Sequence, residues 1–142
     1  MATRVVLDTN CLISALIFSQ GKMAEIRHLW QAGEIIPLIC RETATELIRV
    51  MAYPKFRLTQ EEINHLLAEF LPWAETVHLA SHCENIPGLR DQDDAIFLHL
   101  ARSAKAFCLI SGDRHLLELR SSIEDVRILS PGEYLEQRHP HG

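Results

Sequence analysis

The stretch VVLDTN (residues 5–10) decides the fold class of this 142-residue chain. Its three apolar residues are typical of a short strand that is buried on both faces of a parallel sheet. Asp8, Thr9 and Asn10 follow this strand, where a plain turn would favour glycine or proline. Ligands of parallel sheets bind beyond the carboxyl ends of the strands, so these polar side chains indicate a binding site.

Strands and helices alternate along the rest of the chain. Apolar runs predict further strands at residues 35–39, 76–79, 107–110 and 126–129. Apolar residues at helical spacing predict helices at residues 11–18, 22–32, 42–51, 60–71 and 92–105. T-x-x-E at Thr59 and S-x-x-E at Ser130 are capping boxes, and the second predicts a last helix. This alternation favours an α/β fold with a mostly parallel sheet and helices on both of its faces.

Length and composition are typical of one globular domain. We place this domain at residues 1–136 and expect a flexible tail at residues 137–142. The net charge is −5, which argues against a protein that binds nucleic acid by bulk charge alone. It is compatible with a nucleic-acid enzyme whose acidic site is neutralised by bound cations.

Cysteine spacing and hydropathy bear on the location of the protein. The four cysteines form no C-x-x-C motif, so we expect reduced thiols in a cytoplasmic protein rather than a zinc site. They are Cys11, Cys40, Cys83 and Cys108. The N-terminus does not have the pattern of a signal peptide, and no apolar stretch reaches the length of a membrane span. We therefore expect no membrane association.

Carboxylates stand next to apolar elements at four separate places. Asp8 and Asp113 follow predicted strands. Glu46 borders the apolar stripe of one predicted helix, and Asp94 opens another. A parallel sheet would bring several of them to one cleft, where their mutual repulsion favours bound cations. An all-oxygen set of ligands favours Mg²⁺ or Mn²⁺ over zinc, and such a site suits phosphodiester hydrolysis.

Each carboxylate also has a purely structural interpretation. The two aspartates after strands are suited to turns. Asp91 is suited to an N-cap, with Asp94 favourable to the dipole of the same helix. Glu46 is placed to pair with Arg49 three residues later. Taken singly, these interpretations are favoured, and only the joint placement of the carboxylates favours a common cleft.

Three ordered blocks of sequence carry a resemblance to a known family. They are VVLDTNCLISAL (residues 5–16), CRETATELIRVMAYPKF (residues 40–56) and LRDQDDAIFLHLARSAKAFCLISGDRHLL (residues 89–117). Together they resemble PIN-domain proteins, and among these the VapC-like toxin components of toxin–antitoxin systems. The resemblance implies a three-layer α/β/α sandwich with a mostly parallel central sheet. It also implies a Mg²⁺- or Mn²⁺-dependent ribonuclease for single-stranded RNA, with a cognate antitoxin protein that inserts a segment into its cleft.

The resemblance also assigns roles to individual residues. The metal-binding and catalytic quartet of the family falls on Asp8, Glu46, Asp94 and Asp113. Asp91 matches a further acidic position, Asn10 would orient the first aspartate or a bound water, and Ser111 would act similarly near Asp113. Positive groups are expected around the substrate phosphates. The candidates are Arg41, Arg49, Lys55 and Arg114, with Lys22 and Arg57 as further ones.

The chain departs from the family pattern at two helix starts. Cys40-Arg41 stands where relatives often have Ser-Pro, which predicts a weaker helix cap. DQDDAI (residues 91–96) stands where many relatives read DPDDDK, so one acidic residue and one lysine are missing. These departures leave the quartet intact and predict weaker contacts to the substrate.

Two other classes of function remain open at this stage. A phosphatase or phosphoacceptor domain would use Asp8 as the nucleophile, although such sites usually have a lysine where this chain has Arg114. A non-catalytic RNA- or protein-binding module would keep the fold without the chemistry. A homodimer is a further expectation, through an apolar stripe that is more suited to packing on its own core. The stripe consists of Leu66, Leu67, Phe70 and Leu71.

Overall fold

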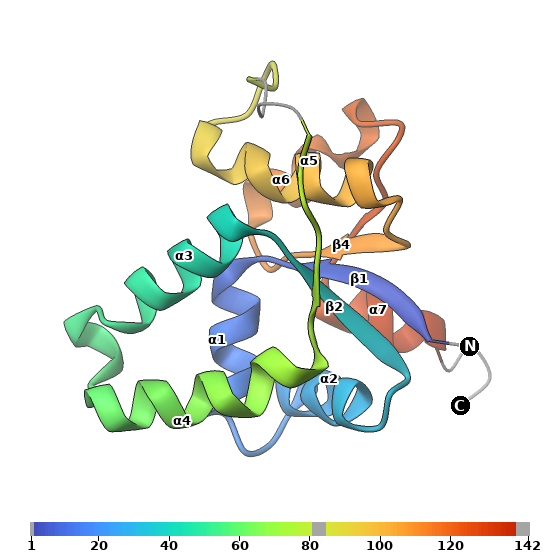
Figure 1. Cartoon of the computed structure of the whole chain (residues 1–142). Helices are drawn as coiled ribbons and strands as arrows, with labels where there is room; N and C mark the ends of the chain where they lie inside the picture. The colour runs from blue at the N-terminus through green and yellow to red at the C-terminus, as the bar shows by residue number, and fades with distance from the viewer. Residues whose placement is uncertain (1, 81–84, 139–142) are drawn as a thin grey trace.

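The computed structural model describes residues 2–80 and 85–138, and its centre is a parallel sheet of five strands. The strands are β1 (Thr3–Leu7), β2 (Ile35–Ile39), β3 (Glu75–Thr76), β4 (Cys108–Ile110) and β5 (Ile128–Leu129). Their order is β3-β2-β1-β4-β5, so β1 lies between β2 and β4 (Figure 1). The connections change direction at β1, which is where parallel sheets bind their ligands.

Helices cover both faces of the sheet, and the predicted three-layer α/β/α sandwich is confirmed (Figure 1). One face is covered by α1 (Thr9–Ile17), α2 (Lys22–Gln31), α4 (Gln60–Phe70) and α7 (Pro131–Arg138). The other is covered by α5 (Ala95–Ala104) and α6 (Arg114–Leu119). Helix α3 (Arg41–Met51) contacts both α1 and α5.

The apolar run of β1 supplies both hydrophobic layers. Val5 and Leu7 pack into the core beneath α1, α2 and α4, whereas Val6 packs into the core beneath α5. Successive side chains of a strand point to opposite faces, so a central parallel strand must be apolar throughout. Val5 pairs with Pro37 of β2 and with Cys108 of β4. Pro37 therefore lies inside the predicted strand although it cannot donate a hydrogen bond.

Several element boundaries differ from the sequence prediction. β3 covers Glu75–Thr76 rather than residues 76–79, and β5 is confined to Ile128–Leu129. Both are edge strands, which pair on one side only and are therefore shorter than their apolar runs. The helix predicted at residues 92–105 begins with a 3₁₀ turn, Gln92–Asp94, before α5. Helix α6 was not predicted, because its six residues are too few to show a helical period.

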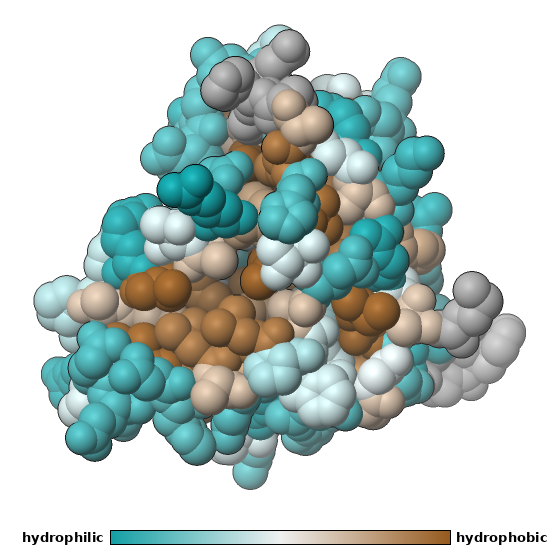
Figure 2. Space-filling view, in the orientation of Figure 1, coloured by the Kyte–Doolittle hydropathy of each residue, from teal (hydrophilic) through white to brown (hydrophobic). Residues whose placement is uncertain are grey.

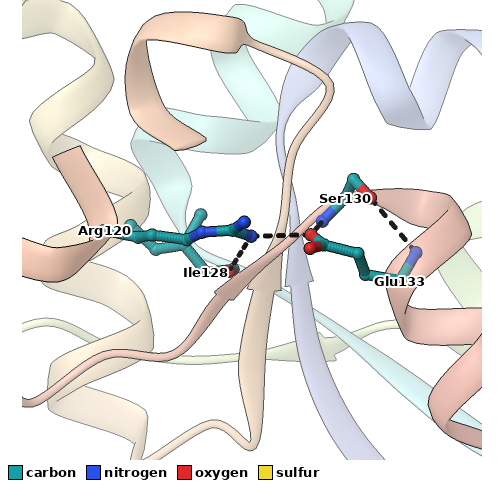
Figure 3. Close-up of polar contacts among 4 residues, drawn as sticks. All are labelled: Arg120, Ile128, Ser130 and Glu133. Atoms are coloured by element: carbon teal, nitrogen blue, oxygen red, sulfur yellow. Dashed lines mark hydrogen bonds and ion pairs between the residues drawn. The ribbon is translucent and has the colours of Figure 1, made fainter. Parts of the chain in front are cut away.

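Helix α7 begins with the predicted capping box (Figure 3). The Ser130 N–H donates to Glu133 Oε1 at 2.9 Å, and the Glu133 N–H donates to Ser130 Oγ at 3.1 Å. Arg120, after α6, donates to the same Oε1 at 2.7 Å. These donors, the Arg120 guanidinium foremost, lower the pKa of Glu133 to about 2. The helix continues through Arg138, whose guanidinium pairs with Glu34 at 3.0 Å.

Helix α4 uses most of its apolar stripe inside the molecule. Thr59 and Glu62 form the predicted capping box. Phe70 is buried against Trp30, while Leu66 and Leu67 pack partly buried against the same core. In the stripe considered for a homodimer, Leu71 remains 43% exposed. Figure 2 shows hydrophobic residues gathered between α3 and α4.

The described helices and cysteines allow two further statements. No described helix combines the length and apolar character needed to cross a membrane. Cys11, Cys40 and Cys108 are buried free thiols, whereas Cys83 lies outside the described residues. The three described cysteines therefore contribute to packing rather than to disulfides.

Candidate active site

Asp8 is held in place at the carboxyl end of β1 by three hydrogen bonds, two of them with the end of β4. Its N–H continues the sheet by donating to the Ile110 carbonyl at 3.1 Å. Its Oδ1 accepts the N–H of Cys11 at 2.9 Å, so Asp8 is the N-cap of α1. Its Oδ2 accepts the hydroxyl of Ser111 at 2.5 Å. The turn role considered for Asp8 is therefore real, and the same contacts fix the direction of its carboxylate.

Ser111 connects the first and the last carboxylate of the predicted quartet. It follows β4, is fully buried, and its Oγ accepts the N–H of Asp113 at 3.0 Å while donating to Asp8. Asp113 in turn caps α6 by accepting the N–H of His115 at 3.0 Å. Asp8 and Asp113 are far apart in sequence, and one buried hydroxyl sets their relative position.

Glu46 projects from α3 toward the same strand ends. Its Oε2 accepts the hydroxyl of Thr9 at 2.8 Å, and its Oε1 lies 3.8 Å from the Arg49 guanidinium. The Arg49 pair was anticipated from the sequence, whereas the Thr9 contact was not. Thr9 was noted as one of three polar residues after the first strand, but nothing in the sequence indicates its partner 37 residues away.

Asp91 and Asp94 approach from the start of α5. Asp91 caps the 3₁₀ turn by accepting the N–H of Asp93 at 3.0 Å. Asp94 makes no capping hydrogen bond. Burial, followed by the nearby carboxylates, raises the pKa of Asp94 to about 6. The charges that raise it are those of Asp91, Asp113, Asp8 and Glu46, in decreasing order. Carboxylates from three other parts of the chain, together with Asp91 of the same turn, thus raise the pKa of one carboxyl group.

All four quartet residues line one pocket, which we call the acidic pocket. Its volume is about 660 Å³, and its polar lining includes Asp8, Asn10, Glu46, Asp91, Asp94 and Asp113. Ser111 lies behind this lining and is hydrogen-bonded to Asp8. Tyr53 and Lys55 also line it, so Lys55 is the candidate phosphate-binding residue that reaches the pocket.

The other candidate basic residues lie elsewhere. Arg41 and Arg49 line a second hollow of about 670 Å³, between α3 and the start of α5, which we call the side groove. Arg114 is 93% exposed and pairs with Glu118 at 3.3 Å. Among the described residues that line the acidic pocket and the side groove, Arg114, Lys22 and Arg57 do not occur. Of the predicted cations, Lys55 therefore lines the acidic pocket, two line the side groove, and the other three line neither.

The acidic pocket suits a hard divalent cation by the chemistry of its donors. Its ionisable ligands are carboxylates, and burial raises the pKa of the neighbouring Cys11 thiol, which keeps that sulfur protonated. Within the described ranges, no group of three or more histidine, cysteine, aspartate or glutamate side chains is placed to hold a metal ion. Mg²⁺ usually keeps several waters and takes only one or two carboxylates besides the substrate phosphate. The residues present fit that mode of binding.

Two side chains that the sequence analysis did not assign to the site hold the loop before Asp91. The Gln92 amide donates to the carbonyls of Ile86 and Leu89 at 3.0 and 2.9 Å. His115 Nε2 accepts the N–H of Arg90 at 2.9 Å. Gln92 stands at a departure from the family pattern, which was its only signal. The only sequence signal for His115 is its position two residues after Asp113.

Comparisons with known proteins agree with this geometry. A family model described as "PIN domain" matches residues 4–115. The uncharacterized protein MJ1680 of Methanocaldococcus jannaschii is 27% identical over 141 residues, covering 94% of this chain and 90% of that protein. A chain in the crystal structure of VapBC2 from Rickettsia felis bound to a DNA fragment from their promoter is similar with a TM-score of 0.63 and 14% identity. The match covers 90% of this chain and 98% of that chain, and it shows a shared fold.

Proposed function

The chain belongs to the PIN-domain family, and we propose that it is a ribonuclease that hydrolyses single-stranded RNA with the help of Mg²⁺ or Mn²⁺. PIN domains are typically nucleases, and the resemblance drawn from three blocks of sequence is confirmed at the level of the family. The observation that carries the proposal is the gathering of Asp8, Glu46, Asp94 and Asp113 around one pocket. Carboxylates that share one pocket repel one another, and a bound divalent cation relieves this repulsion.

The residues of the acidic pocket have distinct tasks in this proposal. One or two of Asp8, Glu46, Asp94 and Asp113 would hold the ion directly, and the other carboxylates, with Asp91, would contact its bound waters. When bound, the ion lowers the pKa of a water molecule and stabilises charge on the leaving oxygen. Ser111 and Thr9 keep two of the carboxylates aimed into the pocket. Asn10 offers an amide to a water or to the substrate, and Lys55 offers a positive charge to a phosphate.

An antitoxin partner belongs to the same proposal. The structural neighbour is a chain of VapBC2, and we propose that this protein likewise pairs with a cognate antitoxin that blocks the acidic pocket. A positively charged side chain of such a partner would neutralise the carboxylates of the acidic pocket when no metal ion is bound. We place the pair in the cytoplasm, where the buried thiols of Cys11, Cys40 and Cys108 would stay reduced.

The phosphoacceptor alternative is less compatible with the environment of Asp8. Both oxygens of this carboxylate already accept hydrogen bonds, from Cys11 and from Ser111. Hydrogen bonds to a carboxylate stabilise its negative charge and so reduce its nucleophilicity. Lys55 would support either reaction, phosphodiester hydrolysis or phosphoryl transfer to Asp8, because it offers a positive charge to a phosphate. A stable phosphate on Asp8 after incubation with acetyl phosphate would support the alternative.

The test is cleavage of a labelled single-stranded RNA by the purified full chain. We expect cleavage with Mg²⁺ or Mn²⁺, none with EDTA, and none by Asp8→Asn. Glu61→Gln is the matched control, because Glu61 is an exposed carboxylate at the start of α4 outside the acidic pocket. Cleavage that persists in EDTA or in Asp8→Asn would refute the proposal. RNA binding without metal-dependent cleavage would instead support the non-catalytic module.

A further inference from the structure

The side groove lies directly beside the acidic pocket. One wall is the face of α3 that carries Glu42, Thr45 and Arg49, which are spaced as i, i+3 and i+7 and so lie along one side of the helix. The opposite wall is the start of α5, including Ala95 and Ile96. Figure 2 shows hydrophilic residues over the upper end of α3 in this region.

Glu46 joins the two hollows, because its side chain lines both of them. The turn at the start of α5 does the same, with Gln92 and Asp93 on the groove side and Asp94 on the pocket side. An RNA strand with one phosphate at the acidic pocket therefore has the side groove within reach of an adjacent nucleotide. This step rests on the proposed function.

The charges of the side groove do not suit a phosphate. Arg41 and Arg49 are accompanied by Glu42, Glu46 and Asp93, so carboxylates outnumber cations among its lining residues. A phosphate would be repelled by them, whereas the edge of a base presents both hydrogen-bond donors and acceptors. Single-stranded RNA exposes these edges, since its bases are unpaired. The mixed lining therefore suits a base.

Arg49 is already held in a defined orientation. Its Nη1 donates to the Tyr53 hydroxyl at 2.5 Å, and its guanidinium lies 3.8 Å from Glu46. The guanidinium also lies 5.8 Å from the centre of the Tyr53 ring. An arginine with a fixed direction loses less conformational entropy on binding than a free one, which favours a specific contact.

We propose that the side groove binds a guanine base of the RNA substrate, with Glu42 accepting from its Watson–Crick edge and Arg49 donating to its O6 and N7 atoms. Among the four RNA bases, guanine offers two donors side by side, N1–H and N2–H₂, together with two adjacent acceptors. A carboxylate matches the donors and an arginine matches the acceptors. The Ala95 and Ile96 side chains supply apolar surface for the face of the ring.

The test measures binding rather than cleavage, so that it is independent of the nuclease proposal. Fluorescence anisotropy with Ca²⁺ in place of Mg²⁺ or Mn²⁺, so that a hard cation neutralises the acidic pocket, would compare labelled hexauridylates that carry one guanosine, adenosine or cytidine. We expect the guanosine probe to bind about tenfold more tightly than the others. Inosine, which lacks the N2 amino group, and 7-deazaguanosine, which lacks N7, should each lose most of this preference.

Two variants assign the contacts to atoms. Glu42→Gln should bind guanosine and inosine equally, and Arg49→Gln should bind guanosine and 7-deazaguanosine equally. Glu61→Gln, on α4 and outside the side groove, is the charge-matched control and should keep both differences. Equal affinity for all bases, a preference for another base, no binding of any probe, or a guanosine preference unchanged in Glu42→Gln would each overturn the inference. A guanosine preference without metal-dependent cleavage would leave it standing and refute the nuclease proposal alone.

Discussion

Asp94 and Glu133 each stand at the start of a helix, but their surroundings shift their pKa values in opposite directions. Burial and four neighbouring carboxylates raise the pKa of Asp94 to about 6. Arg120 and the N–H of Ser130 lower the pKa of Glu133 to about 2 (Figure 3). One carboxylate is surrounded by charges of its own sign, and the other by donors that neutralise it.

The opposite pKa shifts distinguish the start of α7, whose interactions stabilise the fold, from the acidic pocket, whose repulsion does not. The interactions of Glu133 are complete within the chain, and they attach α7 to the edge of the sheet beside β5. The repulsion around Asp94 is relieved only when a proton or a cation arrives from outside. Electrostatic repulsion of this kind destabilises the fold, and pKa values shifted by buried neighbouring charges are typical of functional sites.

Removing the charge of Asp94 should have the largest effect and should move activity and stability in opposite directions. Asp94→Asn should reduce Mn²⁺-dependent RNA cleavage by about 100-fold or more, because even residues behind the ligands of a metal are worth about 10- to 100-fold. In EDTA at pH 7 its free energy of unfolding should rise by about 1 kcal/mol, a value discounted for the partial exposure of the carboxyl group. RNA cleavage and urea unfolding measure the two changes. A variant that loses stability together with activity would show that Asp94 is structural.

Ser111→Ala should have the next largest effect, since it removes the hydroxyl that connects Asp8 with Asp113. The variant leaves the N–H of Asp113 and one oxygen of Asp8 without this partner. We expect Mn²⁺ affinity, measured by isothermal titration calorimetry, to fall about 10-fold or more. Ser121→Ala, in an exposed turn, is the control. An unchanged Mn²⁺ affinity would contradict the positioning role.

Glu133→Gln should show a smaller effect, on stability alone. Loss of the charge-assisted contact with Arg120 and of part of the capping box should lower the free energy of unfolding by about 1 kcal/mol. Cleavage per folded molecule should stay unchanged. Glu136→Gln, an exposed carboxylate on the same helix, should leave both quantities as they are. Urea unfolding measures the change in stability. A change in cleavage per folded molecule would mean that the start of α7 is coupled to the acidic pocket.

In EDTA, the free energy of unfolding should depend on pH through both Asp94 and Glu133, with small slopes of opposite sign. Asp94 has a raised pKa, so the folded state binds a proton that the unfolded chain has lost, and stability falls as pH rises from about 4 to about 6. Glu133 has a lowered pKa, so its stabilisation is present above pH 4.5 and is lost as pH falls toward 2. Asp94→Asn should remove the first slope and Glu133→Gln the second. Slopes that persist in both variants would assign them to other groups.

The fold was largely predictable because its signals are local and repeated. Apolar runs and helical stripes place β1, β2, β4 and most helices, and the rule for parallel connections supplies the architecture. The misses lie where local signal is short or where tertiary contacts take over. Helix α6 has only six residues, and β3 ends early because it pairs on one side only. The 3₁₀ turn before α5 is closed by hydrogen bonds from Asp93 and Asp94 to Asp91, and it is too short to show a helical period.

The sequence by itself determined the order of the strands and of most helices along the chain, the capping boxes and the acidic residues that the family pattern singles out. Each of these depends on residues close together in the chain or on a recognisable motif. The tertiary structure alone decided that Thr9 holds Glu46, that Ser111 joins Asp8 to Asp113, and that Arg41 and Arg49 line a groove separate from the acidic pocket. Most of these relations join segments far apart in the chain. Distances between such segments are set by the packing of the whole sheet and its helices, which no local pattern of residues encodes.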